Sequence, residues 1–171
     1  MRLSEYTDFS LRVLMYCVAH RDRLVTIAEL ADQHGLSKNH LMKVVNDMAR
    51  RGWIETVRGR GGGLRLLLAP EAIRIGDVVR ATETDFRLVE CFDAATNTCT
   101  LSPGCQLKQL LGDALRDYFK ALDGATLADI TAVGRAAVTM QKTVQATVQK
   151  TVQMPSTLRS VRRVKAAAAN T

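Results

Sequence analysis

Three of the four cysteines in the chain lie close together, and no other feature of the sequence points so directly to chemistry. Cys91, Cys99 and Cys105 follow the spacing C-x7-C-x5-C, whereas Cys17 stands alone near the start of the chain. Thiolates are soft ligands suited to iron–sulfur clusters, zinc and copper(I). Structural zinc usually binds cysteine pairs at much shorter intervals. The wide spacing therefore favours a loop that wraps a larger cluster, although spacing alone does not name the metal.

The residues around the cysteines indicate which of them are placed to bind a metal. Residues 83–104 show no clear periodicity, and a helical pattern begins at Cys105. A thiolate near a helix N-terminus has a lowered pKa, which favours Cys105 as a ligand. Cys17 stands beside Leu14 and Val18 at helical spacing, so we expect it to be a small buried residue rather than a ligand.

The apolar stripe that follows Cys105 predicts one long helix ending near residue 122. The stripe is wide for a helix that closes a small domain, so we expect part of it to pack against a second copy of the chain. Thr126 then caps a final short helix. The stripe consists of Leu107, Leu110, Leu111, Ala114, Leu115, Tyr118, Phe119 and Leu122.

The first part of the chain predicts a helix-turn-helix. An apolar face at helical spacing indicates a first helix over residues 5–19. Thr26 and Glu29 have the spacing of a capping box at the start of a second helix, and Gly35 is suited to end it. Ser37 caps a third helix that runs to about residue 51. Two short helices separated by a glycine-containing turn match the motif.

A basic hairpin follows the third helix. Apolar runs at residues 53–57 and 64–68 predict two strands, and residues 58–63 between them read Arg-Gly-Arg-Gly-Gly-Gly. This stretch is not a nucleotide loop, because it lacks a Gly-Lys-Ser/Thr ending and joins two strands. The predicted fold is mainly α with a small β-hairpin wing, that is, a winged helix-turn-helix plus a long dimerisation helix. We expect a DNA-binding domain at 1–82 and a cysteine loop with dimerisation helix at 83–131, followed by a low-complexity, disordered basic tail at 132–171.

The third helix and the wing carry the side chains expected to bind DNA. Phosphate contacts fix the register of a protein on DNA, and side chains in the major groove read the bases. Each such residue alone is more often part of a solvated surface, but the ordered combination favours DNA binding. The helix start and its exposed face offer Ser37, Lys38, Asn39, His40 and Lys43, and the wing tip offers Arg58 and Arg60.

Charge and composition narrow the class of protein. Residues 1–80 carry a net charge of +4, residues 81–131 carry −4 and residues 132–171 carry +7. The basic first part suits a polyanion such as double-stranded DNA. We find no secretory signal and no run of about 18 apolar residues, so we expect a cytoplasmic protein with no membrane contact. No acid–base pair, nucleophile–base set or phosphate loop indicates an enzyme.

Four segments of the chain resemble one known family. These are MRLSEYTDFSLRVLMY at the start, LSKNHLMKVVNDMARRGWIETVRGRGGGLRL, IRIGDVVRATE and PGCQLKQLLGDAL. Together they resemble the iron–sulfur winged-helix repressors over about residues 1–131. The motifs KNHLMKVVN and CTLSPGCQLK resemble more narrowly the nitric-oxide-sensing branch of that family.

The resemblance implies a homodimer with one iron–sulfur cluster per subunit. It assigns Cys91, Cys99 and Cys105 as cluster ligands and Asp8, at the matching N-terminal position, as a fourth ligand given to the partner subunit. Without the resemblance, Asp8 would be a carboxylate favoured by the helix dipole. Other relatives use a histidine just after the third cysteine, where this chain has Gln106. A 4Fe–4S cluster is favoured, but the interval between Cys91 and Cys99 is longer than expected for the family, so a 2Fe–2S cluster stays open.

The resulting functional hypothesis is a repressor that binds operator DNA as a homodimer and loses affinity when nitric oxide nitrosylates its cluster. The alternative within regulation is a sensor of iron or cluster status with the same fold. A redox or metal-storage module without DNA function is a third alternative, against which the basic third helix and wing argue.

Overall fold

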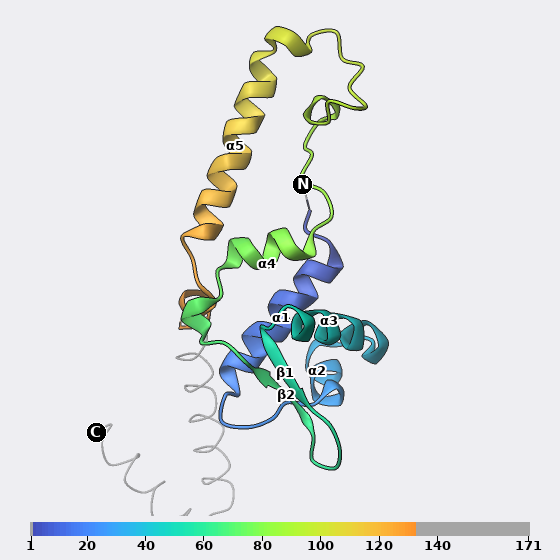
Figure 1. The fold of residues 1–171 in the computed structure, drawn as a ribbon, viewed down its shortest axis with the longest axis vertical. Coiled ribbons are helices and arrows are strands. Elements are labelled where there is room, and N and C mark those ends of the chain that lie inside the picture. Colours follow the sequence, from blue (N-terminus) through green and yellow to red (C-terminus); the bar gives the residue numbers. More distant parts are fainter. Residues whose placement is uncertain (1, 133–171) are drawn as a thin grey trace, which may run out of the picture. The chain divides into compact units, whose positions relative to one another are not determined.

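In the computed structural model, which describes residues 2–132, three helices pack together in the N-terminal part of the chain. They are α1 (Glu5–Ala19), α2 (Ile27–His34) and α3 (Lys38–Arg50) (Figure 1). Apolar side chains at helical spacing turn inwards because their burial removes apolar surface from water. The most deeply buried members of this core include Leu14, Leu30, Leu41, Val44 and Met48. The predicted helix-turn-helix is therefore confirmed.

The helix ends follow from local capping chemistry. The Ser4 hydroxyl accepts a hydrogen bond from the backbone N–H of Thr7, and the Thr26 hydroxyl accepts one from Glu29 at 3.1 Å. Gly35 ends α2 in the left-handed region at φ 65°, where a residue without Cβ is favoured. Ser37 occupies the N-cap position of α3 but makes no side-chain capping bond, so its exposed hydroxyl is available to a ligand.

The wing is a two-stranded antiparallel hairpin of β1 (Ile54–Val57) and β2 (Gly63–Leu66), shorter at each outer end than predicted. Beyond these strands, Leu67 still donates its backbone N–H to the Trp53 carbonyl. On its other side, β2 is tied to Val25 by two backbone hydrogen bonds with Leu64, at 2.8 and 2.9 Å. This connection fixes the wing to the segment just before α2.

Gly63 permits that close approach, and a methyl group there is expected to destabilise the fold. A Cβ at Gly63 would lie 2.6 Å from the Val25 carbonyl oxygen, and that oxygen belongs to backbone that cannot easily move. We expect Gly63→Ala to lower the free energy of unfolding of the metal-free protein by about 1–3 kcal/mol, measured by urea denaturation. Gly104→Ala is the control, because a Cβ there meets nothing within 4 Å. Equal stability of the two variants would contradict this account.

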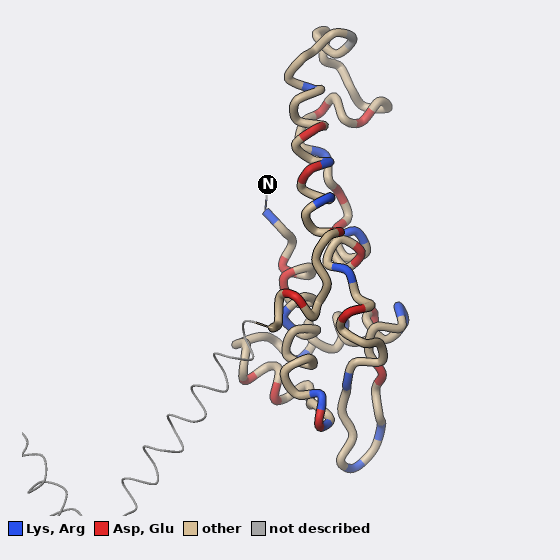
Figure 2. The backbone as a smooth tube through the Cα atoms, turned by 90° about the vertical axis from the view of Figure 1, so that its left-hand side faces the viewer, with Lys and Arg blue, Asp and Glu red and all other residues tan. Residues whose placement is uncertain are grey.

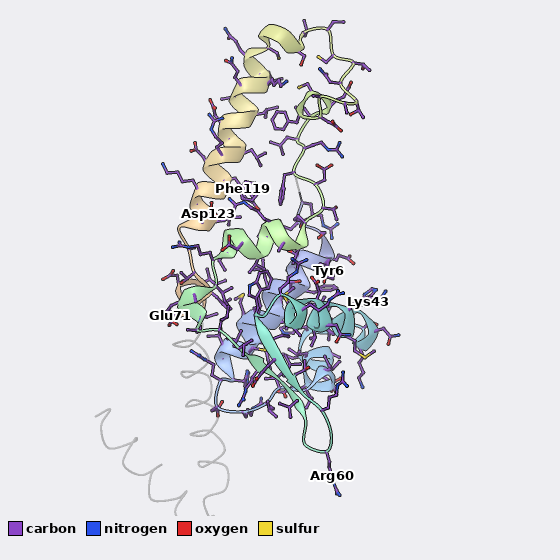
Figure 3. The ribbon with its side chains drawn as sticks, viewed as in Figure 1. Tyr6, Lys43, Arg60, Glu71, Phe119 and Asp123 are labelled. Carbon is purple, nitrogen blue, oxygen red and sulfur yellow. The ribbon has the colours of Figure 1, made fainter. Side chains whose placement is uncertain are left out.

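The C-terminal part of the described chain is organised by α4 (Ile75–Thr82) and the long α5 (Gln106–Asp123). Asp123 at the end of α5 accepts two hydrogen bonds from Arg80 of α4, at 2.6 and 2.7 Å. A Cβ at Gly76 would lie only 1.8 Å from an Asp123 oxygen, so the glycine makes room for this pair. The Arg80 guanidinium also lies over the Phe119 ring at 4.3 Å. Figure 3 shows Phe119 and Asp123 near the lower end of α5.

Residues 2–132 belong to one compact unit. Within it, α4 ends at the position where the first domain was expected to end. Residues 127–132 are helical, as predicted for the short segment after Thr126. In the described part of the chain, no helix is both long and apolar enough to cross a membrane. The predictions for the tail concern residues 132–171, and residues 133–171 lie outside the described residues.

Candidate DNA interface and metal centre

The exposed face of α3 carries the side chains that the sequence predicted for base and phosphate contacts. Its apolar stripe of Leu41, Val44, Val45 and Met48 is buried in the core. The opposite face therefore points to solvent, and its polar side chains are available to a groove of DNA. All of the predicted residues at the start and along this face are exposed: Ser37, Lys38, Asn39, His40 and Lys43.

The wing tip places two arginines at the far end of the hairpin. Arg58 and Arg60 are both exposed, and Figure 3 shows Arg60 pointing away from the molecule. Gly59 and Gly61 adopt φ of 101° and 77°, a backbone shape that side chains other than glycine rarely adopt. In Figure 2, blue segments that mark Lys or Arg lie on the loop of the hairpin. The tip therefore presents positive charge on a narrow projection, which suits phosphate or minor-groove contact.

The one carboxylate on α3, that of Asp47, is paired with arginines of its own segment. Asp47 accepts hydrogen bonds from Arg51 at 2.8 Å and from Arg50 at 3.3 Å. Burial alone would raise the pKa of Asp47, but the hydrogen bonds from Arg51 and Tyr6 hold it below its usual value. Asp47 is therefore a charged acceptor whose negative charge is largely compensated, which lessens its repulsion of DNA.

The three clustered cysteines are thiols in a loop that leads into α5. Cys91 lies in a 3-10 turn, Glu90–Phe92, and Cys99 precedes a second such turn, Ser102–Gly104. Cys105 is the N-cap residue of α5, as its position in the sequence predicted. None of the three is in a disulfide, and each is partly exposed.

Hydrogen bonds draw the segments of this loop together. Glu90, next to Cys91, accepts hydrogen bonds from the backbone and the hydroxyl of Thr98, next to Cys99, both at 2.6 Å. These bonds hold the pKa of Glu90 below its usual value, so it stays a charged acceptor. Sequence analysis missed this contact, because an acid and a threonine eight residues apart give no signal in an irregular segment. The Glu90–Thr98 contact closes the long interval between the first two cysteines.

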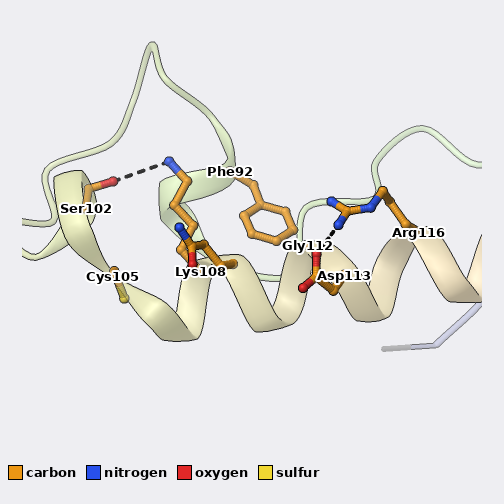
Figure 4. A pocket seen from close by; sticks show the side chains of 8 residues that line it. Phe92, Ser102, Cys105, Lys108, Gly112, Asp113 and Arg116 are labelled. Atoms are coloured by element: carbon orange, nitrogen blue, oxygen red, sulfur yellow. Dashed lines mark hydrogen bonds and ion pairs between the residues drawn. The ribbon is translucent and has the colours of Figure 1, made fainter.

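A cleft of about 770 Å³ opens beside Cys105 (Figure 4). Across it, the Lys108 ammonium donates to the Ser102 hydroxyl at 3.4 Å, which ties the first turn of α5 to the preceding 3-10 turn. Farther along α5, Arg116 pairs with Asp113 in the same cleft. Cys105 is the cysteine that lines the cleft, together with Phe92, Ser102, Lys108, Gln109, Gly112, Asp113 and Arg116.

The three thiols are donors of the chemical kind that holds an iron–sulfur cluster. Among the described residues, no three His, Cys, Asp or Glu side chains converge on a point that could hold one metal ion. In a 4Fe–4S cluster each protein ligand binds a different iron, so the sulfur atoms need not converge on one point. Three partly exposed thiols on one loop supply soft donors of the required kind. Cys91, Cys99 and Cys105 would be the residues that hold such a group.

Asp8 is not brought to the cysteines within a single chain. Its carboxylate pairs with Arg12, one turn later on α1, at 2.8 and 3.0 Å. Asp8 is part-exposed, with 43% of its side chain accessible, so a second chain could reach it. Its assignment as a ligand to the partner subunit therefore stays a prediction.

Cys17 is a core residue, as the sequence predicted, and its chemistry is expected to differ from that of the other three. It is 1% exposed, and burial raises the pKa of its thiol to about 12. Because alkylation requires the thiolate, iodoacetamide at about pH 8 should modify three cysteines of the native metal-free protein and spare Cys17. Peptide mass spectrometry would check this, with urea-unfolded protein modified at all four positions as the control. Modification of Cys17 at the rate of Cys105 in native protein would show that the α1 core opens freely.

A helix-turn-helix with an exposed polar third helix and a basic hairpin wing defines the class of winged-helix transcription regulators. Residues 3–133 match the model of the Rrf2 family, described as an iron-dependent transcriptional regulator. The chain belongs to the Rrf2 family.

Related proteins agree with this assignment. The chain is 52% identical over 131 residues to the HTH-type transcriptional regulator NsrR of Bacillus subtilis (strain 168), covering 76% of this chain and 90% of the relative. It is 47% identical over the same length to the NsrR of Halalkalibacterium halodurans, covering 76% of this chain and 90% of the relative.

Solved structures share the fold. The structure of T. potens IscR matches with a TM-score of 0.64 at 21% identity, covering 80% of this chain and 90% of that one. The oxidised form of Staphylococcus aureus CymR matches with a TM-score of 0.62 at 23% identity, covering 77% and 96%. These likenesses confirm the winged-helix fold predicted from the sequence.

Proposed function

We propose that this protein is a nitric-oxide-sensitive transcription repressor that binds operator DNA as a homodimer and loses affinity when its iron–sulfur cluster is nitrosylated. One observation carries the proposal: three thiols, none in a disulfide, share one hydrogen-bonded loop in a chain that also presents a polar reading helix and a basic wing. The names of its NsrR relatives support a repressor of this branch.

DNA binding is assigned to α3 and the wing. The exposed Asn39, His40 and Lys43 would enter the major groove, while Ser37 and Lys38 at the helix start would meet phosphate. The wing arginines would contact the backbone or the minor groove beside it. Basic side chains that neutralise phosphates release counterions, so we expect affinity to fall steeply as salt rises.

The homodimer is assigned to α5. This helix has no fully buried residue, and Leu107 and Leu110 are 59% and 64% exposed. Burying such an apolar stripe against a second copy would remove it from water. A two-fold dimer would also place two reading helices about 34 Å apart, the distance of one DNA turn, on a near-palindromic operator.

One cluster per subunit, with 4Fe–4S favoured over 2Fe–2S, is assigned to Cys91, Cys99 and Cys105, with Asp8 from the partner subunit as the fourth ligand. When bound, such a cluster supplies iron atoms that react directly with nitric oxide. The cysteine loop of one chain would then be joined to α1 of the other, which fixes the angle between the two winged helices. Release of Asp8 would loosen that angle, so that the two reading helices no longer match successive major grooves.

The test is an absorbance spectrum of protein purified without oxygen, before and after nitric oxide is added. A brown protein whose colour fades in proportion to the amount of nitric oxide added supports the proposal. DNA affinity would be measured on a duplex that the wild-type protein selects from a random-sequence pool, here called the selected duplex, and on a random duplex. Protein that stays colourless after anaerobic reconstitution with iron and sulfide would remove the cluster and leave a winged-helix DNA binder.

Asp8→Ala is expected to weaken binding to the selected duplex while the three cysteines still hold a coloured cluster. The bridge between subunits would be lost, but the thiolate ligands would remain. Anisotropy titrations of the loaded variant would measure the affinity, and Asp32→Ala, on exposed α2 surface, is the matched control. Unchanged affinity and unchanged nitric-oxide sensitivity in Asp8→Ala would refute the bridge.

A sensor of iron or cluster status is the second candidate, favoured by the family description as iron-dependent. The partly exposed loop cysteines would also lose metal to a competing ligand. Comparing the release of the selected duplex by an iron chelator and by nitric oxide separates the two. Release by chelator at concentrations where nitric oxide has no effect would favour the second candidate.

A further inference from the structure

A single polar contact joins the start of α1 to the reading helix. The Tyr6 hydroxyl, on the first turn of α1, donates to the Asp47 carboxylate of α3 at 2.9 Å. Within residues 2–132, this is the only hydrogen bond between a side chain of α1 and a side chain of α3. Figure 3 labels Tyr6 and, on α3, Lys43.

The Tyr6 hydroxyl donates to a carboxylate that Arg51 also holds, at 2.8 Å. Asp47 is only 15% exposed and stays ionised, because Arg51 and Tyr6 both donate to it. The contact is therefore a charge-assisted hydrogen bond, which is stronger than one between neutral groups.

Deeper in the core the two helices pack tightly, but beside this bond part of the space between them is open. A cleft of about 210 Å³ lies between the first turns of α1 and the exposed part of α3. Where side chains do not fill the space between two helices, packing fixes their relative position less closely. The cleft is lined by Glu5, Tyr6, Phe9, His40, Lys43 and Val44.

Tyr6 also stands near the site that the proposed function places on α1. Tyr6 and Asp8 are two residues apart, so their side chains leave the helix about 200° from each other. One therefore faces α3, and the other pairs with Arg12 away from it. A turn of helix moves as a unit, so a shift at the Asp8 side also moves the Tyr6 side.

We propose that the Tyr6–Asp47 hydrogen bond positions the recognition helix α3 on the start of α1, so that movement at the start of α1 changes how well α3 fits DNA. Tyr6 is thus a positioning residue rather than a DNA contact. The claim that α3 fits DNA rests on the proposed function. The claim that the Tyr6–Asp47 bond positions α3 does not.

The test compares Tyr6→Phe with Tyr16→Phe in the full-length protein. Tyr16 is a matched control, because it lies on the same helix and donates to a carboxylate, Glu29 of α2, at 2.7 Å. Each variant loses one hydroxyl and one hydrogen bond to an acid, but only Tyr6→Phe removes a bond to α3. Two readouts are taken: amide hydrogen exchange along α3, and affinity for the selected and the random duplex.

We expect Tyr6→Phe to lower affinity for the selected duplex about fivefold, the equivalent of roughly 1 kcal/mol for one hydrogen bond. Affinity for the random duplex should stay unchanged, because the variant alters no charge. Exchange of α3 amides near Asp47 should quicken. Tyr16→Phe should change neither affinity, and its α3 exchange should match the wild type.

Two results would overturn the inference. In one, Tyr6→Phe leaves both the preference for the selected duplex and α3 exchange as in the wild type. In the other, both variants alter them equally, which would show general destabilisation. If the wild type selects no duplex at all, the proposed function has failed instead. Amide hydrogen exchange along α3 then still tests whether the Tyr6–Asp47 bond positions this helix.

Discussion

Cys105→Ala is expected to leave the protein colourless after anaerobic reconstitution and to abolish its response to nitric oxide. Cys105 is the N-cap residue of α5 and the cysteine that lines the cleft. Its removal leaves two thiolates on the loop, too few to hold a cluster. Loss of groups that merely orient a ligand already lowers metal affinity about 10–100-fold. We therefore expect bound iron per subunit to fall below about a tenth of the wild-type value.

The matched control for this prediction is Cys17→Ala. It removes a thiol of the same kind from the 1%-exposed core position on α1. Cys17→Ala should lower the free energy of unfolding, because the substitution leaves a small cavity in the packed core. Bound iron, the visible spectrum and nitric-oxide bleaching should match the wild type. Full colour in Cys105→Ala, or loss of colour in Cys17→Ala, would mean that the wrong cysteines have been assigned.

Metal-free Cys105→Ala should still fold, because the loop lies outside the buried core. The core residues belong to α1–α4, the wing and the connecting positions Val25, Ile73 and Leu127, and none belongs to α5. Circular dichroism of wild type and variant without metal should therefore agree. An unfolded variant would leave its lack of colour without meaning for the ligand assignment, and Cys91→Ala would then be tested in its place.

Local patterns in the sequence were enough to predict most of the fold. Side chains that cap or end a helix act within four residues, so Thr26 and Gly35 mark the bounds of α2 correctly. Helical spacing likewise identified Leu41 and Met48 as core residues, since apolar burial dominates folding. The wing followed from two apolar runs around a glycine-rich loop.

Contacts between distant residues could not be predicted in the same way. Arg80 and Asp123 are 43 positions apart, and Tyr6 and Asp47 are 41 apart. Each of these residues is of a type that is common on protein surfaces. Only the packing of the helices brings the members of each pair together. The backbone bridge from Val25 to Leu64 is similar, because a short connecting segment gives no signal that it will border a sheet.

The same distinction between local patterns and distant contacts applies to the candidate site. The exposed face of α3 was predictable, because the buried stripe of a helix fixes which residues lie opposite it. Cys105 was placed correctly at a helix start for the same local reason. How the three cysteines are held was not predictable, since it depends on Glu90, Thr98 and the turns between them. The role proposed for Asp8 would depend on a second chain, which no pattern within one chain can position.

The double substitution Asn39→Ala, Lys43→Ala is expected to lower affinity for the selected duplex about 100-fold or more. Each good contact to a base edge contributes about 1–3 kcal/mol, and roughly 1.4 kcal/mol is a factor of ten. Both side chains are exposed on α3, so the fold should not change. Affinity for the random duplex should fall much less, because only one positive charge is removed.

The wing variant Arg58→Ala, Arg60→Ala tests contacts to the DNA backbone rather than to base edges. These exposed arginines are assigned to phosphate or minor-groove contact, so their loss should weaken binding to both duplexes. The slope of log affinity against log salt should become shallower by about 2 per subunit. Arg21→Ala, at an exposed arginine in the turn after α1, is the control for loss of charge.

Anisotropy titrations at several salt concentrations would separate these effects. If the α3 variant loses selectivity while the wing variant loses affinity for both duplexes, α3 reads the bases and the wing anchors the protein. If both variants lower the two affinities equally, α3 contributes charge alone, and base reading must be assigned to other residues. If neither variant changes binding, the exposed face of α3 is solvated surface and DNA meets the protein elsewhere.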